Sequence, residues 1–141
     1  MIYLLYGQPG SGKTSLGTLL ARHLDTPFII DGDEFREMFT NKNYGREGRE
    51  ENIRNANAVA TYLNKKDNDV VMSLVNPYFY LRKELWENNG DQMVEILLQS
   101  DRKLRREYHV EDFEEGVPNA IMNTDGEIGD SWSYLKEVLE I

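Results

Sequence analysis

Short apolar runs alternate along this chain with longer segments in which apolar residues recur every three or four positions. The short runs predict buried β-strands at residues 2–6, 28–30, 69–74, 93–98 and 120–122. The helical spacing predicts α-helices at residues 14–24, 50–65, 78–87 and 131–139. In the first of these helices, Leu16, Leu20 and Leu24 fall on one face, which we expect to lie against the sheet.

Strands that alternate with helices at this spacing predict an α/β fold, with a parallel sheet of about five strands and helices on both faces. The 141 residues are enough for one compact domain, and the chain has no internal repeat. We therefore expect a single domain over residues 1–141. In such sheets, ligands bind at the carboxyl ends of the strands, so functional residues should follow the strands directly.

The first predicted strand is followed by a glycine-rich loop that matches the pattern G-x-x-x-x-G-K-[ST]. Glycines allow successive backbone N–H groups to point at one anion, and the helix that follows offers its positive end to that anion. This arrangement predicts a P-loop NTPase-type fold that binds ATP. The expected ATP-binding residues are Gly7, Gln8, Pro9, Gly10, Ser11, Gly12, Lys13, Thr14 and Ser15. Lys13 would reach the β- and γ-phosphates, and the Thr14 hydroxyl would ligate Mg²⁺ as the cofactor.

Charge and composition limit the partners of such a protein. Sixteen lysines and arginines against 25 aspartates and glutamates give a formal net charge of −9, which disfavours binding of duplex nucleic acid and leaves small-molecule nucleotides as substrates. The absence of cysteine excludes disulfides, thiolate metal sites and cysteine nucleophiles.

The glycine-rich loop interrupts the first apolar run, and no stretch is long enough to span a membrane. We therefore expect a cytoplasmic protein without membrane contact, and a homodimer is left open.

A second motif tests whether the loop belongs to a GTPase switch. Residues 64–67 read Asn-Lys-Lys-Asp, which fits the N-K-x-D pattern that reads guanine. In this chain the motif ends a predicted helix and precedes a strand, on the edge of the sheet away from the phosphate loop. The D-x-x-G tetrapeptide of GTPases does not occur in the sequence. These observations favour a kinase.

Two carboxylates follow the second predicted strand. Asp31 and Asp33 flank Gly32, and such carboxylates can accept a hydroxyl proton, orient the hydroxyl or assist Mg²⁺. The third strand carries no acidic residue at its end, which makes Asp31 or Asp33 the nearest candidate for organising Mg²⁺. An Asx-type turn before a helix is the alternative interpretation of this tripeptide.

Four segments in order resemble the adenylylsulfate kinases. They are the phosphate loop, DGDEFR at residues 31–36, REENIR at residues 49–54 and SLVNPY at residues 73–78. The resemblance covers about residues 1–85. It implies an ATP-dependent transfer of phosphate to the 3′-hydroxyl of adenosine 5′-phosphosulfate, which gives 3′-phosphoadenylylsulfate.

The resemblance also implies roles for individual residues. Asp33 would be the base or orienting group for the acceptor hydroxyl, with Asp31 beside it, and Lys13 would act with it in catalysis. The substrate-binding residues implied in this way are Asp31, Asp33, Arg36, Tyr44, Arg49, Asn52, Asn76 and Pro77. Among these, Arg36, Arg49 and Asn52 would hold the phosphosulfate and ribose, Tyr44 would stack on the base, and Pro77 would line the base pocket. A solvated helix face is the alternative for Arg49.

The chain departs from the family pattern at several positions. Glu34 stands where the family has Asn, and Asn76 stands where the family has Ser. The family's long basic lid is replaced by a short lid region at about residues 99–119. Its cations, Arg102, Lys103, Arg105 and Arg106, either close on the ATP phosphates or form a solvated loop. We expect His109 to be a surface residue.

The shorter lid keeps two other functions open. One is a P-loop kinase that acts on another nucleoside, a nucleic-acid end or a small-metabolite hydroxyl. The other is a regulatory module that binds nucleotide without transferring phosphate.

Overall fold

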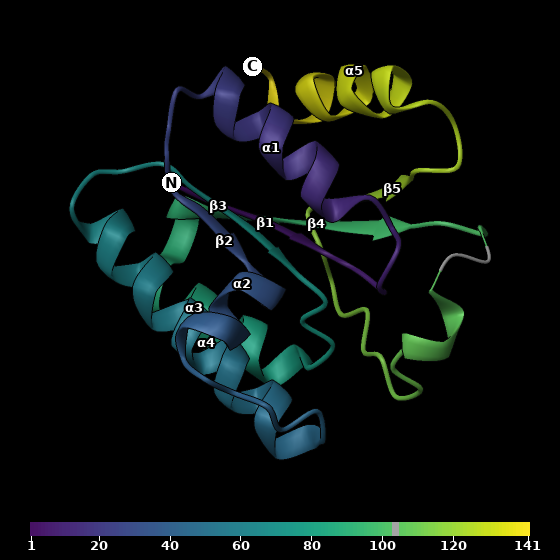
Figure 1. Cartoon of the computed structure of the whole chain (residues 1–141). Helices are drawn as coiled ribbons and strands as arrows, with labels where there is room; N and C mark the ends of the chain where they lie inside the picture. The colour runs from purple at the N-terminus through teal and green to yellow at the C-terminus, as the bar shows by residue number, and fades with distance from the viewer. Residues whose placement is uncertain (103–104) are drawn as a thin grey trace.

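The computed structural model describes residues 1–102 and 105–141. Its five strands form one sheet in the order β2-β3-β1-β4-β5, and each pair of neighbours is parallel, as the sequence predicts (Figure 1). The strands are β1 (Ile2–Tyr6), β2 (Ile29–Asp31), β3 (Val70–Leu74), β4 (Met93–Gln99) and β5 (Ala120–Asn123). The α-helices are α1 (Lys13–His23), α2 (Gly32–Met38), α3 (Arg46–Lys65), α4 (Phe79–Asn89) and α5 (Ile128–Leu139). Two short 3₁₀ turns, η1 (Gly90–Gln92) and η2 (Arg106–Tyr108), complete the described elements.

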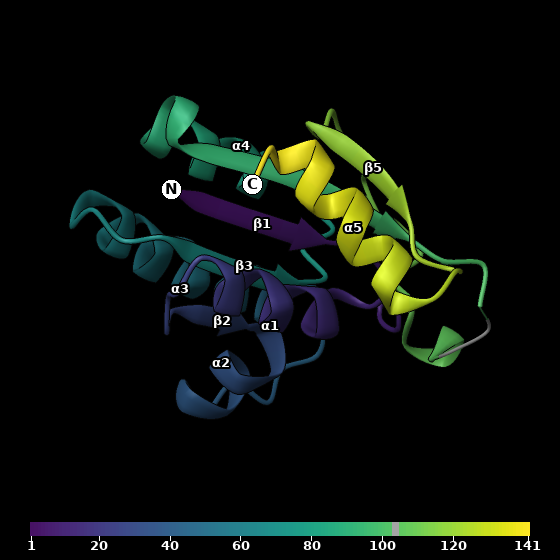
Figure 2. The ribbon, with the colours of Figure 1, turned by 90° about the horizontal axis from the view of Figure 1, so that it is seen from above.

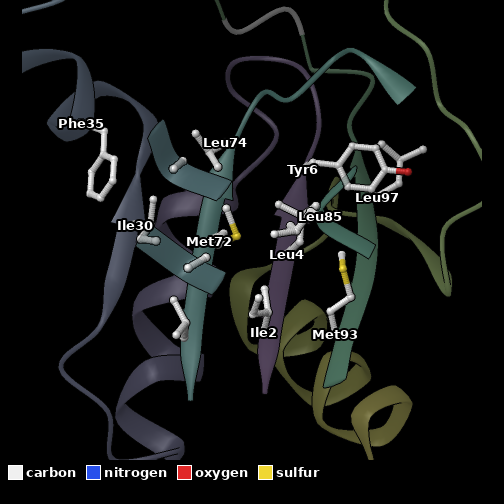
Figure 3. Packing of buried hydrophobic residues seen from close by; sticks show 13 residues of the cluster. Ile2, Leu4, Tyr6, Ile30, Phe35, Met72, Leu74, Leu85, Met93 and Leu97 are labelled. Atoms are coloured by element: carbon white, nitrogen blue, oxygen red, sulfur yellow. The ribbon is translucent and has the colours of Figure 1, made fainter. Parts of the chain in front are cut away.

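The sheet has helices on both faces, which confirms the predicted three-layer architecture. Helices α1 and α5 cover one face, and α3 and α4 lie on the other (Figure 1). Figure 2, which views the structure from above, shows α1 and α5 on the face of the sheet that is turned toward the viewer. Successive residues of a strand point to opposite faces, so Leu5 packs in the cluster that contains Leu16 and Leu135, while Leu4 joins the opposite cluster (Figure 3).

The structure corrects some predicted helix boundaries. Helix α2 was not predicted; it begins directly after β2, and the Asp31 carboxylate caps it by accepting the backbone N–H of Glu34 at 3.2 Å. Helix α3 begins at Arg46 and α5 at Ile128, both earlier than predicted. The first turn of α3 consists of charged residues and a glycine, so it carries no apolar spacing by which the sequence would mark it.

The Asn-Lys-Lys-Asp motif lies where the sequence argument expects it. Helix α3 ends at Lys65, and Asp67 adopts a left-handed backbone conformation with φ of 63° before β3 begins at Val70. This turn therefore lies at the amino ends of the parallel strands, whereas the phosphate loop follows the carboxyl end of β1. Among the described residues, no helix is long and apolar enough to cross a membrane.

Candidate active site

The glycine-rich loop connects β1 to α1 and forms the floor of a cavity of about 390 Å³. Gly10 and Gly12 have φ angles of 86° and 92°, which residues with a Cβ rarely adopt, and Gly12 is the N-cap of α1. The Lys13 ammonium group donates to the carbonyl oxygen of Gln8 at 2.9 Å and to Ser11 Oγ at 3.3 Å. The loop thus places a cation and a helix N-terminus against one cavity, which suits a polyphosphate.

The environment of Lys13 lowers its pKa to about 8. Burial is the main cause, the positive charge of Arg105 adds to it, and the carboxylates of Asp31 and Asp33 oppose it. The Lys13 side chain is therefore fully protonated only well below this pKa. The positive charge that attracts phosphate is lost as the pH rises through the pKa.

We expect the affinity of the free protein for ATP to fall as the pH rises above about 8. The association constant should drop about tenfold for each pH unit above the pKa of Lys13, as proton linkage requires. Titration calorimetry across this range measures the effect. In the Lys13→Arg variant the guanidinium stays charged, so its affinity should be flat over the same range. A wild-type profile as flat as that of Lys13→Arg contradicts the assignment.

Asp31 faces the phosphate cavity and not the cavity where the other predicted substrate residues meet. Its Oδ1 accepts the Thr14 hydroxyl at 3.3 Å, while its Oδ2 caps α2. Asp31 is therefore a helix cap, as the alternative interpretation of the tripeptide predicts, and it also contacts the phosphate loop through Thr14. A hydroxyl and a carboxylate oxygen are ligands that suit Mg²⁺. In residues 1–102 and 105–141, no three His, Asp or Glu side chains gather as a metal cluster.

A second cavity, of about 380 Å³, adjoins the first. The structure brings together in its wall seven of the eight residues predicted for the substrate, namely Asp33, Arg36, Tyr44, Arg49, Asn52, Asn76 and Pro77. Asp33 lines both this cavity and the phosphate cavity. We name the second one the acceptor cavity. Asp33 therefore places a carboxylate at the boundary of the two cavities.

Hydrogen bonds and stacking hold the polar residues of the acceptor cavity. Arg36 donates to the carbonyl oxygen of Asn43 at 2.9 Å, and its guanidinium carbon lies 4.6 Å from the centroid of the Tyr44 ring. Arg49 donates to the Tyr78 hydroxyl at 2.8 Å, so it is anchored to the buried core and does not lie on a solvated face. The ring of Tyr44 remains 71% exposed, which leaves area for stacking.

The predicted lid arginines separate into two groups. Arg102 and Arg105 line the phosphate cavity, and Arg105 lines the acceptor cavity as well. Arg106 lines neither of them and belongs to a third cavity, of about 550 Å³, beside the phosphate loop. Lys103 lies outside the described residues. Arg105 therefore shares with Asp33 the position between the two compartments.

The lid segment packs directly on the phosphate loop. Gln8 donates to the carbonyl oxygen of Val110 at 2.8 Å and accepts the Val110 N–H at 2.9 Å. His109 is half-buried, and its Nε2 lies 3.1 Å from the carbonyl oxygen of Pro9, so this partly exposed residue contacts the phosphate loop. These contacts join residues about one hundred positions apart, and the sequence carried no signal for them.

Arg82 is a further residue that sequence reasoning missed. It lies on α4 with 0% exposure, and its guanidinium carbon lies 4.3 Å from the centroid of the Tyr6 ring. It donates to the carbonyl oxygens of Asn76 and Glu114, each at 2.5 Å. Arg82 thereby ties the loop that borders the acceptor cavity to the segment that returns from the lid. An arginine on an amphipathic helix is normally exposed, so nothing in the sequence pattern indicated this burial.

We expect Arg82→Met to lower the free energy of unfolding by about 2–5 kcal/mol, because it leaves the buried carbonyl oxygen of Asn76 and the partly buried one of Glu114 without their donor. Denaturant unfolding followed by circular dichroism measures the loss. Lys83→Met is the matched control, since Lys83 is the next residue on α4 and its side chain is exposed. An Arg82→Met variant as stable as Lys83→Met contradicts the role of Arg82.

The fold and the phosphate loop together define a P-loop NTPase-type nucleotide-binding protein. The family model for adenylylsulphate kinase matches residues 1–115, and the chain belongs to this family. An adenylyl-sulfate kinase of Myxococcus xanthus is 36% identical over 106 residues, which cover 70% of this chain and 57% of that protein. A cytidine diphosphoramidate kinase of Campylobacter jejuni is 32% identical over 114 residues, which cover 72% of this chain and 66% of that protein.

Solved structures agree on the fold. The APS kinase CysC of Mycobacterium tuberculosis in complex with AMPPNP and APS superposes with a TM-score of 0.82 at 20% identity, covering 99% of this chain and 97% of that chain. A gluconokinase of Sinorhizobium meliloti gives a TM-score of 0.72 at 15% identity, covering 98% and 90% of the two chains. In sequence, the chain matches only 57% of the length of the adenylyl-sulfate kinase of Myxococcus xanthus.

Proposed function

We propose that this chain transfers the γ-phosphoryl group of ATP to the 3′-hydroxyl of adenosine 5′-phosphosulfate, which forms 3′-phosphoadenylylsulfate and ADP. The observation that carries the proposal is the place of Asp33, which lines both the phosphate cavity and the acceptor cavity. Membership of the adenylylsulphate kinase family supports this choice of acceptor.

The donor phosphates bind the loop at the N-terminus of α1. Backbone N–H groups and the Lys13 ammonium hold the β- and γ-phosphates, which displaces the hydrogen bonds that Lys13 makes to Gln8 and Ser11. Thr14 and Asp31 would hold Mg²⁺ by their oxygens, and this ion when bound neutralises phosphate charge. The donor is thus oriented toward the acceptor cavity.

Asp33 serves the acceptor hydroxyl. Its carboxylate accepts the hydroxyl proton as the acceptor oxygen bonds to the γ-phosphorus and the bond from that phosphorus to the β–γ bridging oxygen breaks, so that ADP leaves with the electron pair. Arg105 lines both cavities and stabilises the negative charge on the transferring group. Together these two residues perform the transfer at the boundary between donor and acceptor.

The remaining residues of the acceptor cavity orient the substrate. The guanidinium groups of Arg36 and Arg49 bind the doubly anionic phosphosulfate, and Asn52 binds the ribose. The Tyr44 ring stacks on the base, and Pro77 lines the base pocket. Their common location in one cavity supports this assignment.

A cytidine nucleotide is the second candidate acceptor. The match to the cytidine diphosphoramidate kinase covers 66% of that relative, against 57% for the adenylyl-sulfate kinase of Myxococcus xanthus. The same Asp33 would then act on a hydroxyl of that nucleotide.

A coupled assay of ADP release tests the proposal. The protein is incubated with Mg·ATP and, separately, adenylylsulfate, cytidine diphosphoramidate, and a panel of other nucleosides and small alcohols. Release that depends on adenylylsulfate supports the first proposal, and release only with the cytidine nucleotide replaces it by the second. ATP binding without release for any acceptor overturns both and favours a regulatory module.

A further inference from the structure

We propose that Asn76 selects the base of the acceptor nucleotide, by pairing its side-chain amide with an exocyclic amino group and the ring nitrogen beside it. The acceptor class is then a nucleotide of adenine or cytosine. This inference rests on the proposed function, because it assigns a partner to a residue of the acceptor cavity.

The first observation is an unpartnered amide in the wall of that cavity. Asn76 is 1% exposed, and neither its Nδ2 nor its Oδ1 has a hydrogen-bond partner among residues 1–102 and 105–141. Asn76 contributes to the lining of the acceptor cavity. Buried polar groups in native proteins are almost always paired, and an unpaired one is costly. A donor and an acceptor left unpaired side by side in a ligand cavity indicate a ligand that completes them.

The second observation is that the backbone of Asn76 is held in place. Its φ of 44° lies in the left-handed region, which asparagine tolerates better than most residues. Its carbonyl oxygen accepts a hydrogen bond from the buried Arg82 at 2.5 Å, and the next residue, Pro77, accepts one from the Glu114 N–H at 2.9 Å. The backbone that carries the amide is therefore held in a fixed position beside the cavity, as recognition of a flat base edge requires.

The chemistry of the amide fits an amino-substituted base. An asparagine side chain presents one carbonyl acceptor and N–H donors in one plane, and it pairs with the amino group and ring nitrogen of adenine in two parallel hydrogen bonds. Cytosine has the same sequence of groups on its edge. The serine at this position in the family pattern offers a single hydroxyl, which cannot make the paired contact. The substitution thus gives this chain a means of reading the base that the family pattern lacks.

Acceptor analogues in which hydrogen replaces the exocyclic amino group test the proposal. Wild-type protein should lose about 10- to 100-fold in kcat/KM with the analogue, the discrimination that one paired contact provides. In Asn76→Gly, glycine suits the left-handed backbone and the amide is absent, so the two acceptors should be used equally within about threefold. Asn76→Asp keeps the oxygen that accepts the amino N–H and removes only the donor to the ring nitrogen, so it should lower kcat/KM for both acceptors and keep the preference for the amino-substituted one.

Asn57→Ala is the matched control. Asn57 on α3 also has an unpartnered Oδ1, but it lies outside the acceptor cavity. This variant should keep the wild-type discrimination, which separates base reading from a general effect of removing a buried amide. Thermal unfolding of all the variants checks that they are folded.

The outcomes separate this inference from the function on which it rests. If wild-type protein phosphorylates the acceptor and its analogue without the amino group equally well, Asn76 does not select the base. The kinase assignment is then unaffected. Discrimination that persists in Asn76→Gly also overturns the role of Asn76. Absence of turnover with every adenine and cytosine nucleotide overturns the proposed function and this inference together.

Discussion

Lys13→Ala is expected to lower kcat for acceptor phosphorylation about 1000-fold, the effect of removing a principal charge from a phosphoryl-transfer site. Lys13 is the one lysine that lines the phosphate cavity within the described residues. Its ammonium group hydrogen-bonds only within the loop, to Gln8 and Ser11, so its loss should leave the fold intact. Coupled ADP release at saturating Mg·ATP and acceptor measures kcat.

Lys42→Ala is the control for this substitution, because Lys42 is exposed and lies outside the three cavities around the phosphate loop. It should keep wild-type kcat. A Lys13→Ala variant that retains more than about a tenth of wild-type kcat is incompatible with a charge that stabilises the transition state.

Asp33→Asn should lower kcat about 100- to 1000-fold, because the amide cannot take the proton of the acceptor hydroxyl. The amide has nearly the same shape, and the residues that hold ATP are unchanged. The dissociation constant of Mg·ATP should therefore remain within about threefold of wild type. Single-turnover kinetics with the acceptor, together with calorimetric titration of ATP, separates the two quantities.

Glu34→Gln provides a matched control one residue further along α2. Glu34 is exposed and borders neither the phosphate cavity nor the acceptor cavity. The substitution makes the same chemical change, from carboxylate to amide, and should leave kcat unchanged. If Asp33→Asn and Glu34→Gln had the same kcat, Asp33 would have no role in proton transfer.

The fold follows from the sequence because its signals are local. Buried parallel strands are apolar almost throughout, as in β3, where Val70, Met72 and Leu74 are all buried, and such runs are visible in the sequence. Helix α2 escaped prediction because it is short and carries only one buried residue, Phe35. Its start was nevertheless encoded in Asp31, whose carboxylate is a standard helix cap.

The site follows from the sequence only in part. The carboxyl ends of parallel strands meet at one edge, so residues after β1, β2 and β3 were expected to gather there, and the cavities contain them. The contacts of Gln8 with Val110, and of Arg82 with Glu114, depend on how the lid segment returns to the sheet. These pairs are far apart in sequence and have no spacing rule, so the structure was needed to find them.

Phosphorus NMR of the product from ATP and adenylylsulfate tests the central claim most directly. We expect a new phosphate monoester on the 3′-oxygen of the ribose, with the phosphosulfate intact and one ADP formed for each product. Inorganic phosphate and ADP without a phosphorylated acceptor would contradict it, as would phosphate on any other position of the nucleotide.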